Sequence, residues 1–312
     1  LLEGVSYTPQ GEGSLIPNSM FRGTGPAQPY LNYALLGVIA YAPEACEAAA
    51  NLKKSITRLG MVLGSTGPLA EFNNLESLDL TGSEELENLN GLSPLKKLKQ
   101  IKVRGCRSLQ NVDGLANSTK FKNLDLGECD ALQNLDGLAG CTILINLDLS
   151  DCISLQNVNG LANCTKLAKL DLSNCQALQD VDGLESCTKL TSLNLASCTS
   201  LQNIDGLVNC TKFILGKDFG KKLDLTECGS LQNVNGLANC TKLRSLDLSG
   251  CASLVNIDGL AGCTKLTELN LTGCGALRNV SGLETAKLKQ LDIAETELKT
   301  LNNLTTTNVK SL

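Results

Sequence analysis

The chain is organised around one unit, which reads CTKLAKLDLSNCQALQDVDGLESC over residues 164–187. Its frame is L-x-x-L-x-L-x-x-C-x-x-L-x-x-V-x-G-L-x-x-C-T-K, and most copies follow each other every 23 residues, with one step of 30 and a last step of 22. A fixed period of this length predicts a solenoid of stacked units. The third leucine of the frame, or its replacement, recurs at ten positions: Leu80, Val103, Leu126, Leu149, Leu172, Leu195, Leu225, Leu248, Leu271 and Ile293.

Each unit combines two kinds of periodicity. Residues 169–173 alternate between polar and apolar side chains, which predicts a short strand with one buried face. Asn174 then turns the chain, and Leu178, Val181, Leu184 and Cys187 follow at every third residue, a spacing that favours a 3₁₀ or short helical return path. We therefore predict a right-handed α/β solenoid, a horseshoe or arc with about ten parallel strands on the concave face and 3₁₀ or short helical segments on the convex side.

The repeats GLANCTKLAKLDLSNC and GLANCTKLRSLDLSGC resemble the leucine-rich repeats of phosphatase regulatory subunits and of bacterial internalins, whose frame is GLxxLxxLxxLxLxxN. LDLSGCASL is also similar to units of plant intracellular immune receptors. The resemblance covers about residues 68–312 and implies a surface that binds other proteins. This chain departs from the first two families by placing Cys where their frame has Asn after the strand and Leu before it.

Composition changes divide the chain into three parts. Residues 1–30 are rich in Gly, Pro, Ser and Thr and predict an irregular leader or an extended arm. Residues 31–67 predict a helical N-terminal cap, with a helix over 43–60, or alternatively a small separate domain. Residues 68–312 form the repeats, with an insertion near 213–219 and an incomplete last unit, because Val309 and Leu312 repeat the positions of Leu288 and Leu291.

Two surfaces are candidates for binding a protein partner. The first is a file of ten strand positions that face outwards, one per repeat, and seven of them are Asp, including Asp79 and Asp292 at its two ends. These carboxylates suggest either a solvated consensus face or a contact for a basic partner. The second is the insertion, a loop whose aromatic and basic groups are scarce elsewhere. The candidate residues are Asp125, Asp148, Asp171, Asn194, Asp224, Asp247 and Asn270 in the file, and Phe213, Lys217, Phe219, Lys221 and Lys222 in the insertion.

A file of lysines belongs to the C-T-K turns at the edge where the strands start. Lysine at such an edge usually keeps it soluble, and a weak anion-binding rim is the alternative. The file comprises Lys120, Lys166, Lys189, Lys212, Lys242 and Lys265.

The chain has 15 cysteines, and 14 of them fall into two files that the repeat generates. The spacing contains no CxxC pair, and Ser83, Ser118 and Thr296 replace Cys in outer units, so we predict inert, unpaired core thiols. So many free thiols favour the cytoplasm or another reducing compartment.

Composition argues against several functions. The chain has no His and shows no phosphate-binding glycine loop, so we predict no catalytic residues, no metal and no cofactor. A net charge of −5 argues against nucleic acid, and the apolar run 31–42 is too short to span a membrane. We predict a non-enzymatic protein-interaction module that binds through the concave face. The alternative is a structural segment of a larger assembly, recognised through its ends and lateral faces.

Overall fold

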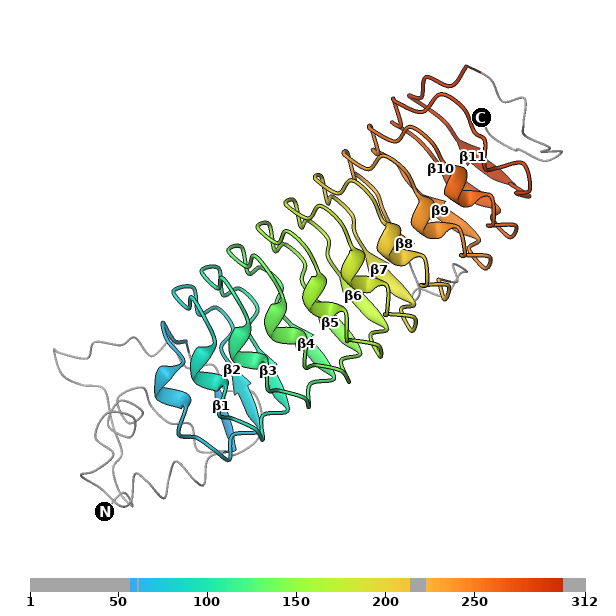
Figure 1. Cartoon of the computed structure of the whole chain (residues 1–312). Coiled ribbons are helices and arrows are strands. Elements are labelled where there is room, and N and C mark those ends of the chain that lie inside the picture. Colours follow the sequence, from blue (N-terminus) through green and yellow to red (C-terminus); the bar gives the residue numbers. More distant parts are fainter. Residues whose placement is uncertain (1–56, 61, 214–222, 300–312) are drawn as a thin grey trace, which may run out of the picture.

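The computed structural model describes residues 57–60, 62–213 and 223–299. In these ranges each repeat forms one coil of a solenoid with a short strand on one side, and every coil except the one between β10 and β11 has a 3₁₀ helix on the other (Figure 1). The strands are β1 (Arg58–Gly60), β2 (Ser77–Asp79), β3 (Gln100–Lys102), β4 (Asn123–Asp125), β5 (Asn146–Asp148), β6 (Lys169–Asp171), β7 (Ser192–Asn194), β8 (Leu223–Asp224), β9 (Ser245–Asp247), β10 (Glu268–Asn270) and β11 (Gln290–Asp292). The 3₁₀ helices are η3 (Gly67–Leu69), η4 (Asn90–Leu92), η5 (Asp113–Leu115), η6 (Asp136–Leu138), η7 (Asn159–Leu161), η8 (Asp182–Leu184), η9 (Asp205–Leu207), η10 (Asn235–Leu237) and η11 (Asp258–Leu260).

The strands pair in parallel and in sequence order, with equivalent repeat positions side by side. Leu147 of β5 pairs with Leu170 of β6, and Asp148 pairs with Asp171. Strands β1 to β8 form one sheet, and β9 to β11 form a second. The backbone connection continues across this break, because the Glu227 amide donates to the Ser249 carbonyl at 2.7 Å. The parallel sheet and the 3₁₀ return path are therefore confirmed.

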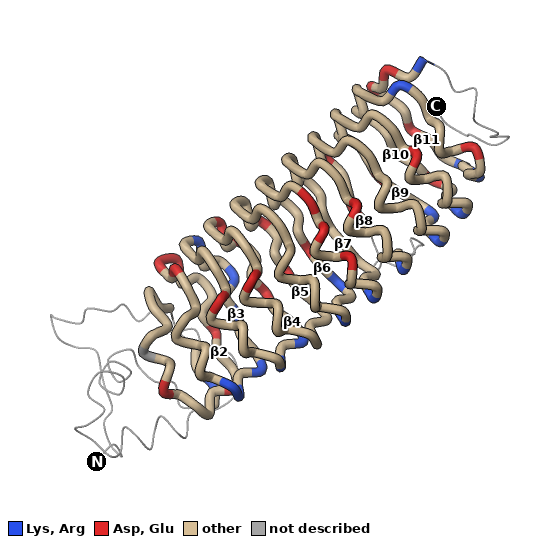
Figure 2. Tube along the Cα trace, viewed as in Figure 1, with Lys and Arg blue, Asp and Glu red and all other residues tan. Residues whose placement is uncertain are grey.

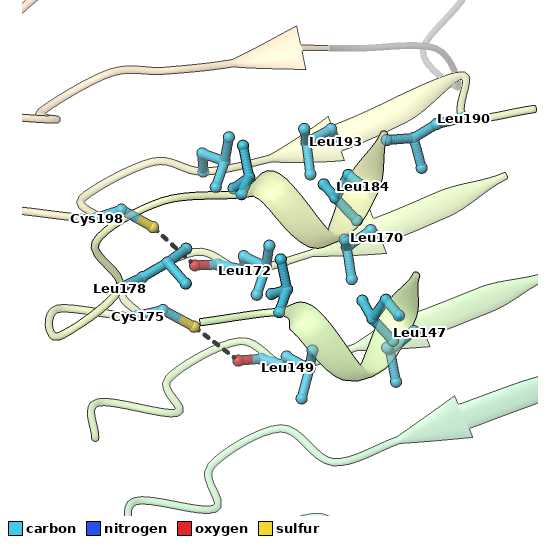
Figure 3. Close-up of a cluster of buried hydrophobic side chains, with 14 of the residues drawn as sticks. Leu147, Leu149, Leu170, Leu172, Cys175, Leu178, Leu184, Leu190, Leu193 and Cys198 are labelled. Carbon is cyan, nitrogen blue, oxygen red and sulfur yellow. Dashed lines mark hydrogen bonds between the residues drawn. The ribbon is translucent and has the colours of Figure 1, made fainter. Parts of the chain in front are cut away.

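The core lies between the sheet and the 3₁₀ helices. In the unit of residues 164–187, all eight apolar frame positions are at most 2% exposed. They are Leu167, Leu170, Leu172, Cys175, Leu178, Val181, Leu184 and Cys187. Figure 3 shows the leucines of neighbouring coils stacked on one another. Since each coil buries its apolar side chains against the next, the repeats stabilise one another as a contiguous array.

The turn after each strand uses the left-handed backbone region. Asn174 has a φ of 61°, and Gly250 has a φ of 77° at the equivalent position. Asn and Gly adopt this region more readily than other residues. The predicted turn at Asn174 is confirmed.

The start of the solenoid differs from the prediction. Arg58–Gly60 forms strand β1, whereas the sequence predicted that these residues end a helix. Leu59 pairs with Leu78, only 19 residues further on (78 − 59), and the Thr57 carbonyl accepts hydrogen bonds from the Glu76 and Ser77 amides at 2.8 and 3.1 Å. This unit is shorter than the usual repeat, which conceals its frame in the sequence. The predicted leader 1–30 and the rest of the predicted helix lie outside the described residues.

Candidate functional site

The outward face of the sheet carries a groove of about 1110 Å³ that crosses β1 to β7. Its lining comes largely from the residues on either side of each strand leucine, because alternate side chains of a strand point to the same face. Four predicted residues line the groove: Asp125, Asp148, Asp171 and Asn194. Three others occupy the same position on β8, β9 and β10, outside the groove lining: Asp224, Asp247 and Asn270.

The acidic file has a structural task. Oδ1 of Asp171 accepts hydrogen bonds from the Ser173 amide at 3.0 Å and from the Ser173 hydroxyl at 2.7 Å, which holds the turn after β6. Asn194 accepts a hydrogen bond from the amide two residues further on, at 3.1 Å, and Asn270 does so at 3.0 Å. Such turns need only a side-chain oxygen. The negative charge is therefore not required by the turn.

Arg104 neutralises one part of this file. Its Nη1 lies 3.2 Å from Asp148 and 3.5 Å from Asp125, and its Nη2 lies 2.8 Å from Glu128. Burial lowers the pKa of Arg104, but the hydrogen bond to Glu128 and the charges of Asp125 and Asp148 raise it by more. Arg104 supplies one positive charge to three carboxylates, and Asp171 has no cationic partner within the described ranges, so uncompensated negative charge extends from β4 to β6.

Basic side chains line the same groove where the strands begin, and apart from Lys120 the sequence analysis did not select them. Lys99 lies beside Glu76 at 2.9 Å, while Lys122 and Lys169 form no ion pair with any residue that the structure describes. Their signal in the sequence is their position, one or two residues before the buried strand leucine. The groove is thus basic along the start of the strands and acidic along their ends.

The insertion residues have different outcomes. Phe213 was predicted to contact a partner, but its side chain is 1% exposed and lies in the core. It replaces the leucine that other units have at this position, such as Leu190 and Leu243. An aromatic ring here fills the coil beside the insertion, so Phe213 is removed from the candidate surface. The other predicted residues of this segment, Lys217, Phe219, Lys221 and Lys222, lie outside the described residues.

The cysteines of the described ranges are all free and buried. In the file after the strands, each thiol donates to a strand carbonyl of the preceding coil, as Cys175 does to Leu149 at 3.3 Å and Cys198 to Leu172 at 3.1 Å (Figure 3). Burial raises the pKa of Cys187 and Cys210 to about 12. A thiolate is the nucleophilic form of cysteine, so these groups are unreactive in the folded chain.

No cluster of three potential metal ligands occurs among the described residues. No helix in those ranges has the length and apolar character needed to cross a bilayer.

Two family comparisons match separate parts of the chain. Residues 165–209 match a family described as leucine-rich repeats in two copies, and residues 215–312 match the leucine-rich-repeat domain of the endo-β-N-acetylglucosaminidase EndoS. With the coil geometry above, these matches decide the classification. The repeats of this chain are leucine-rich repeats. No curated protein sequence matches this leucine-rich-repeat chain.

Three solved structures show different degrees of likeness to this chain. An internalin, inlF of Listeria monocytogenes, is 21% identical over 86% of this chain and 84% of its own, with a TM-score of 0.54. The leucine-rich-repeat domain of the type III effector XopL is 19% identical over 76% of this chain and 88% of its own, with a TM-score of 0.49. A chain of the Toll–Spatzle complex of Drosophila is 20% identical over 80% and 34%, with a TM-score of 0.48. The likeness to the internalin confirms the predicted repeat fold.

Proposed function

We propose that this leucine-rich-repeat chain is a non-enzymatic module that binds a protein partner through the outward face of its sheet. The observation that carries the proposal is the groove across β1 to β7, lined by polar and charged side chains on a rigid array of short strands. Side chains held on strands give a pre-organised surface, which lowers the ordering cost of binding. The buried thiols and the lack of a metal cluster in the described ranges also support a binding role rather than catalysis.

The groove favours a partner that presents both signs of charge. Asp171 offers an unneutralised carboxylate near the end of β6, and Lys122 and Lys169 offer ammonium groups near the strand starts. A bound segment with a basic side chain over Asp171 and an acidic side chain over Lys122 and Lys169 would complement the charges at both ends of the strands. The single positive charge of Arg104 is shared by Asp125, Asp148 and Glu128, so this cluster stays net negative. Basic groups of the partner are therefore expected along β4 to β6.

The test removes charge from the sheet face without breaking its turns. The triple variant Asp148→Asn/Asp171→Asn/Asp247→Asn keeps an oxygen that can hold each turn, as Asn194 and Asn270 do in the native chain. A partner is first captured with the native chain from the source extract, identified, purified and titrated against each variant. Exposed charge pairs contribute about 0.2–1 kcal/mol each, so we expect the Kd to rise roughly tenfold.

The matched control removes three charges from the opposite side of the solenoid. Asp113, Asp136 and Asp258 are exposed residues of the 3₁₀ helices, and their replacement by Asn changes the net charge by the same amount. We expect this control to leave the Kd unchanged. An equal loss of affinity in both triple variants, or no loss in either, would count against binding through the sheet face.

The match of residues 215–312 favours a second candidate, because that family is named for the repeat domain of an endo-β-N-acetylglucosaminidase. We propose as this alternative that the chain holds a glycoprotein substrate for a glycan-cleaving enzyme. The test compares binding to one glycoprotein before and after removal of its N-linked glycans. Binding that depends on the glycan would support this alternative, and equal binding to a panel of glycosylated and unglycosylated proteins would reject it.

A further inference from the structure

A file of exposed lysines runs along the edge where the strands start. Five consecutive coils, those of β6 to β10, each contribute one lysine from the C-T-K turn. Figure 2 shows basic residues gathered along this edge of the solenoid. We call these five residues the lysine rim: Lys166, Lys189, Lys212, Lys242 and Lys265. None of them lines the groove.

The charges of the lysine rim are not neutralised by the protein. Within the described ranges, none of its five ammonium groups forms an ion pair with a carboxylate. The ammonium groups also affect one another. The charge of Lys189 lowers the pKa of Lys212, and burial and the charge of Lys242 lower it further. The file is therefore continuous across the insertion, and its like charges repel each other along its length.

Solubility alone does not require this arrangement. An edge is kept soluble by charges of both signs, and mixed signs avoid the repulsion. Neighbouring coils in a parallel sheet are about 4.8 Å apart, so five coils place a row of positive charges over roughly 19 Å. A single-sign row of this kind is electrostatically complementary to a linear polymer that carries regularly spaced anions.

The side chains of the rim distinguish between kinds of polyanion. Proteins that bind single-stranded nucleic acid combine positive charge with aromatic rings on which the bases stack. In the described ranges all three aromatic side chains, Phe72, Phe121 and Phe213, are buried. The rim instead places an exposed threonine beside each lysine, as in Thr188–Lys189, which adds a hydroxyl donor for an oxyanion.

We propose that the lysine rim binds a linear sulfated polysaccharide, with successive sulfates against the lysines of successive coils. The lysine ammonium is a compact point charge on a flexible stem, so it can follow sulfates whose spacing varies along the sugar chain. This surface is separate from the groove that is proposed to bind protein, and the two can be occupied and tested independently.

The experiment titrates the chain with a heparin oligosaccharide over a series of salt concentrations. The test variant is Lys189→Gln/Lys212→Gln/Lys242→Gln. The charge-matched control is Lys102→Gln/Arg107→Gln/Arg278→Gln, which removes three exposed cations from other surfaces. Circular dichroism and thermal unfolding are recorded for each variant. A desulfated oligosaccharide and a single-stranded oligothymidylate are titrated in parallel.

We expect the native chain to bind heparin, and the rim variant to bind at least about tenfold more weakly than the control. The slope of log K against log salt should fall by about two, since each lost contact with a linear polyanion removes roughly 0.7 from it. The inference is overturned if heparin does not bind, if both triple variants weaken binding equally, or if the desulfated sugar or the oligothymidylate binds as tightly. The sheet-face variant Asp148→Asn/Asp171→Asn/Asp247→Asn should still bind heparin, which separates this inference from the proposed function.

Discussion

Cys175 and Cys187 are both fully buried, yet their sulfur atoms have different surroundings. Sγ of Cys175 lies 3.3 Å from the Leu149 carbonyl oxygen, and the other members of its file make equivalent contacts at 3.1–3.3 Å. Sγ of Cys187 lies 3.6 Å and 3.7 Å from two carbonyl oxygens. The first file therefore donates a short hydrogen bond between coils, whereas Cys187 of the second file makes two longer and weaker ones.

This difference predicts unequal costs for the same deletion. Cys175→Ala removes a buried S–H donor, but the Leu149 carbonyl keeps its hydrogen bond from the Cys152 amide at 3.2 Å. The lost hydrogen bond therefore costs about 0.5–1.5 kcal/mol in addition to the lost packing. Cys187→Ala serves as the matched control, because it removes the same atom from an equally buried position. Urea unfolding should show Cys175→Ala to be the less stable variant by at least ~0.5 kcal/mol. Equal stabilities would show that both files act only as small apolar groups.

The sequence predicted that the cysteines are buried and unpaired, and it did not predict the donor role. The residues that replace Cys in outer units held a signal, because Ser83 and Thr296 are small but also carry a hydroxyl. In the structure these hydroxyls make other hydrogen bonds: Oγ1 of Thr296 donates to the Ile293 carbonyl of its own coil at 2.8 Å, and Oγ of Ser83 accepts from the Leu63 amide at 3.0 Å. The repeat pattern gives the size and polarity of a position, but the partner carbonyl belongs to the preceding coil and is located only by the three-dimensional stacking.

At the scale of single elements, the glycine of each 3₁₀ helix controls how closely two coils approach. A Cβ on Gly183 would lie 2.1 Å from the carbonyl oxygen of Val158 in the preceding coil. Glycine often marks a turn with a positive φ, but Gly183 does not adopt one. The structure shows a different cause, because the space is occupied by the backbone of the neighbouring coil.

Gly183→Ala should therefore force two coils apart. We expect a loss of about 3 kcal/mol or more in the free energy of unfolding, because a rigid backbone atom cannot yield as a flexible side chain can. Gly229→Ala is the control, since a Cβ there meets no atom within 4 Å. The control should change stability by less than ~1 kcal/mol and can be stabilising. Guanidinium unfolding of both variants tests this prediction, and a Gly183→Ala chain as stable as the control would contradict it.

Strand β1 is an element that the repeat pattern did not predict. The regular units were predicted correctly because each copy supports the frame of the others. The β1 unit is shorter and has no intact copy beside it in the sequence, so its short apolar segment was assigned to a helix. Its register with β2, Leu59 opposite Leu78, is set by pairing across coils and not by local propensity.

At the scale of the whole molecule, opposite charges are segregated to different surfaces. Basic residues follow the edge where the strands start, and the 3₁₀ helices carry exposed acids such as Asp182 and Asp205 (Figure 2). Burial and the neighbouring Asp180 and Asp205 raise the pKa of Asp182, which indicates that this acidic side lacks compensating cations nearby. The net charge of −5 is therefore the sum of separate basic and acidic surfaces, and composition alone could not rule out a polyanionic partner.

The buried thiols also give the whole solenoid a distinctive response to alkali. Burial raises the pKa of Cys164 to about 11 and of Cys141 to about 12, from the ordinary thiol value of 9.0, because the thiolate loses hydration in the core. The folded state therefore keeps its thiol protons above pH 9, while the unfolded chain releases them. The stabilisation is complete below the unfolded pKa of 9.0 and is lost as pH rises towards the folded values.

Because fourteen cysteines of the described ranges behave in this way, their effects add. Each thiol lowers the free energy of unfolding by up to about 1.4 kcal/mol per pH unit above pH 9, so the full set contributes up to roughly 19 kcal/mol per unit. We expect cooperative unfolding within about one pH unit above 9, with the ultraviolet absorbance of thiolate rising together with the loss of circular dichroism. Removing two thiols in Cys141→Ala/Cys187→Ala should reduce the pH dependence measured by urea unfolding by up to about 2.7 kcal/mol per unit, despite a lower stability at neutral pH. Cys46 lies outside the described residues and is replaced by Ala in this experiment. Thiolate absorbance that then appears near pH 9 while the circular dichroism is unchanged would show that solvent reaches the thiols in the folded solenoid, and the closed core described here would then be wrong.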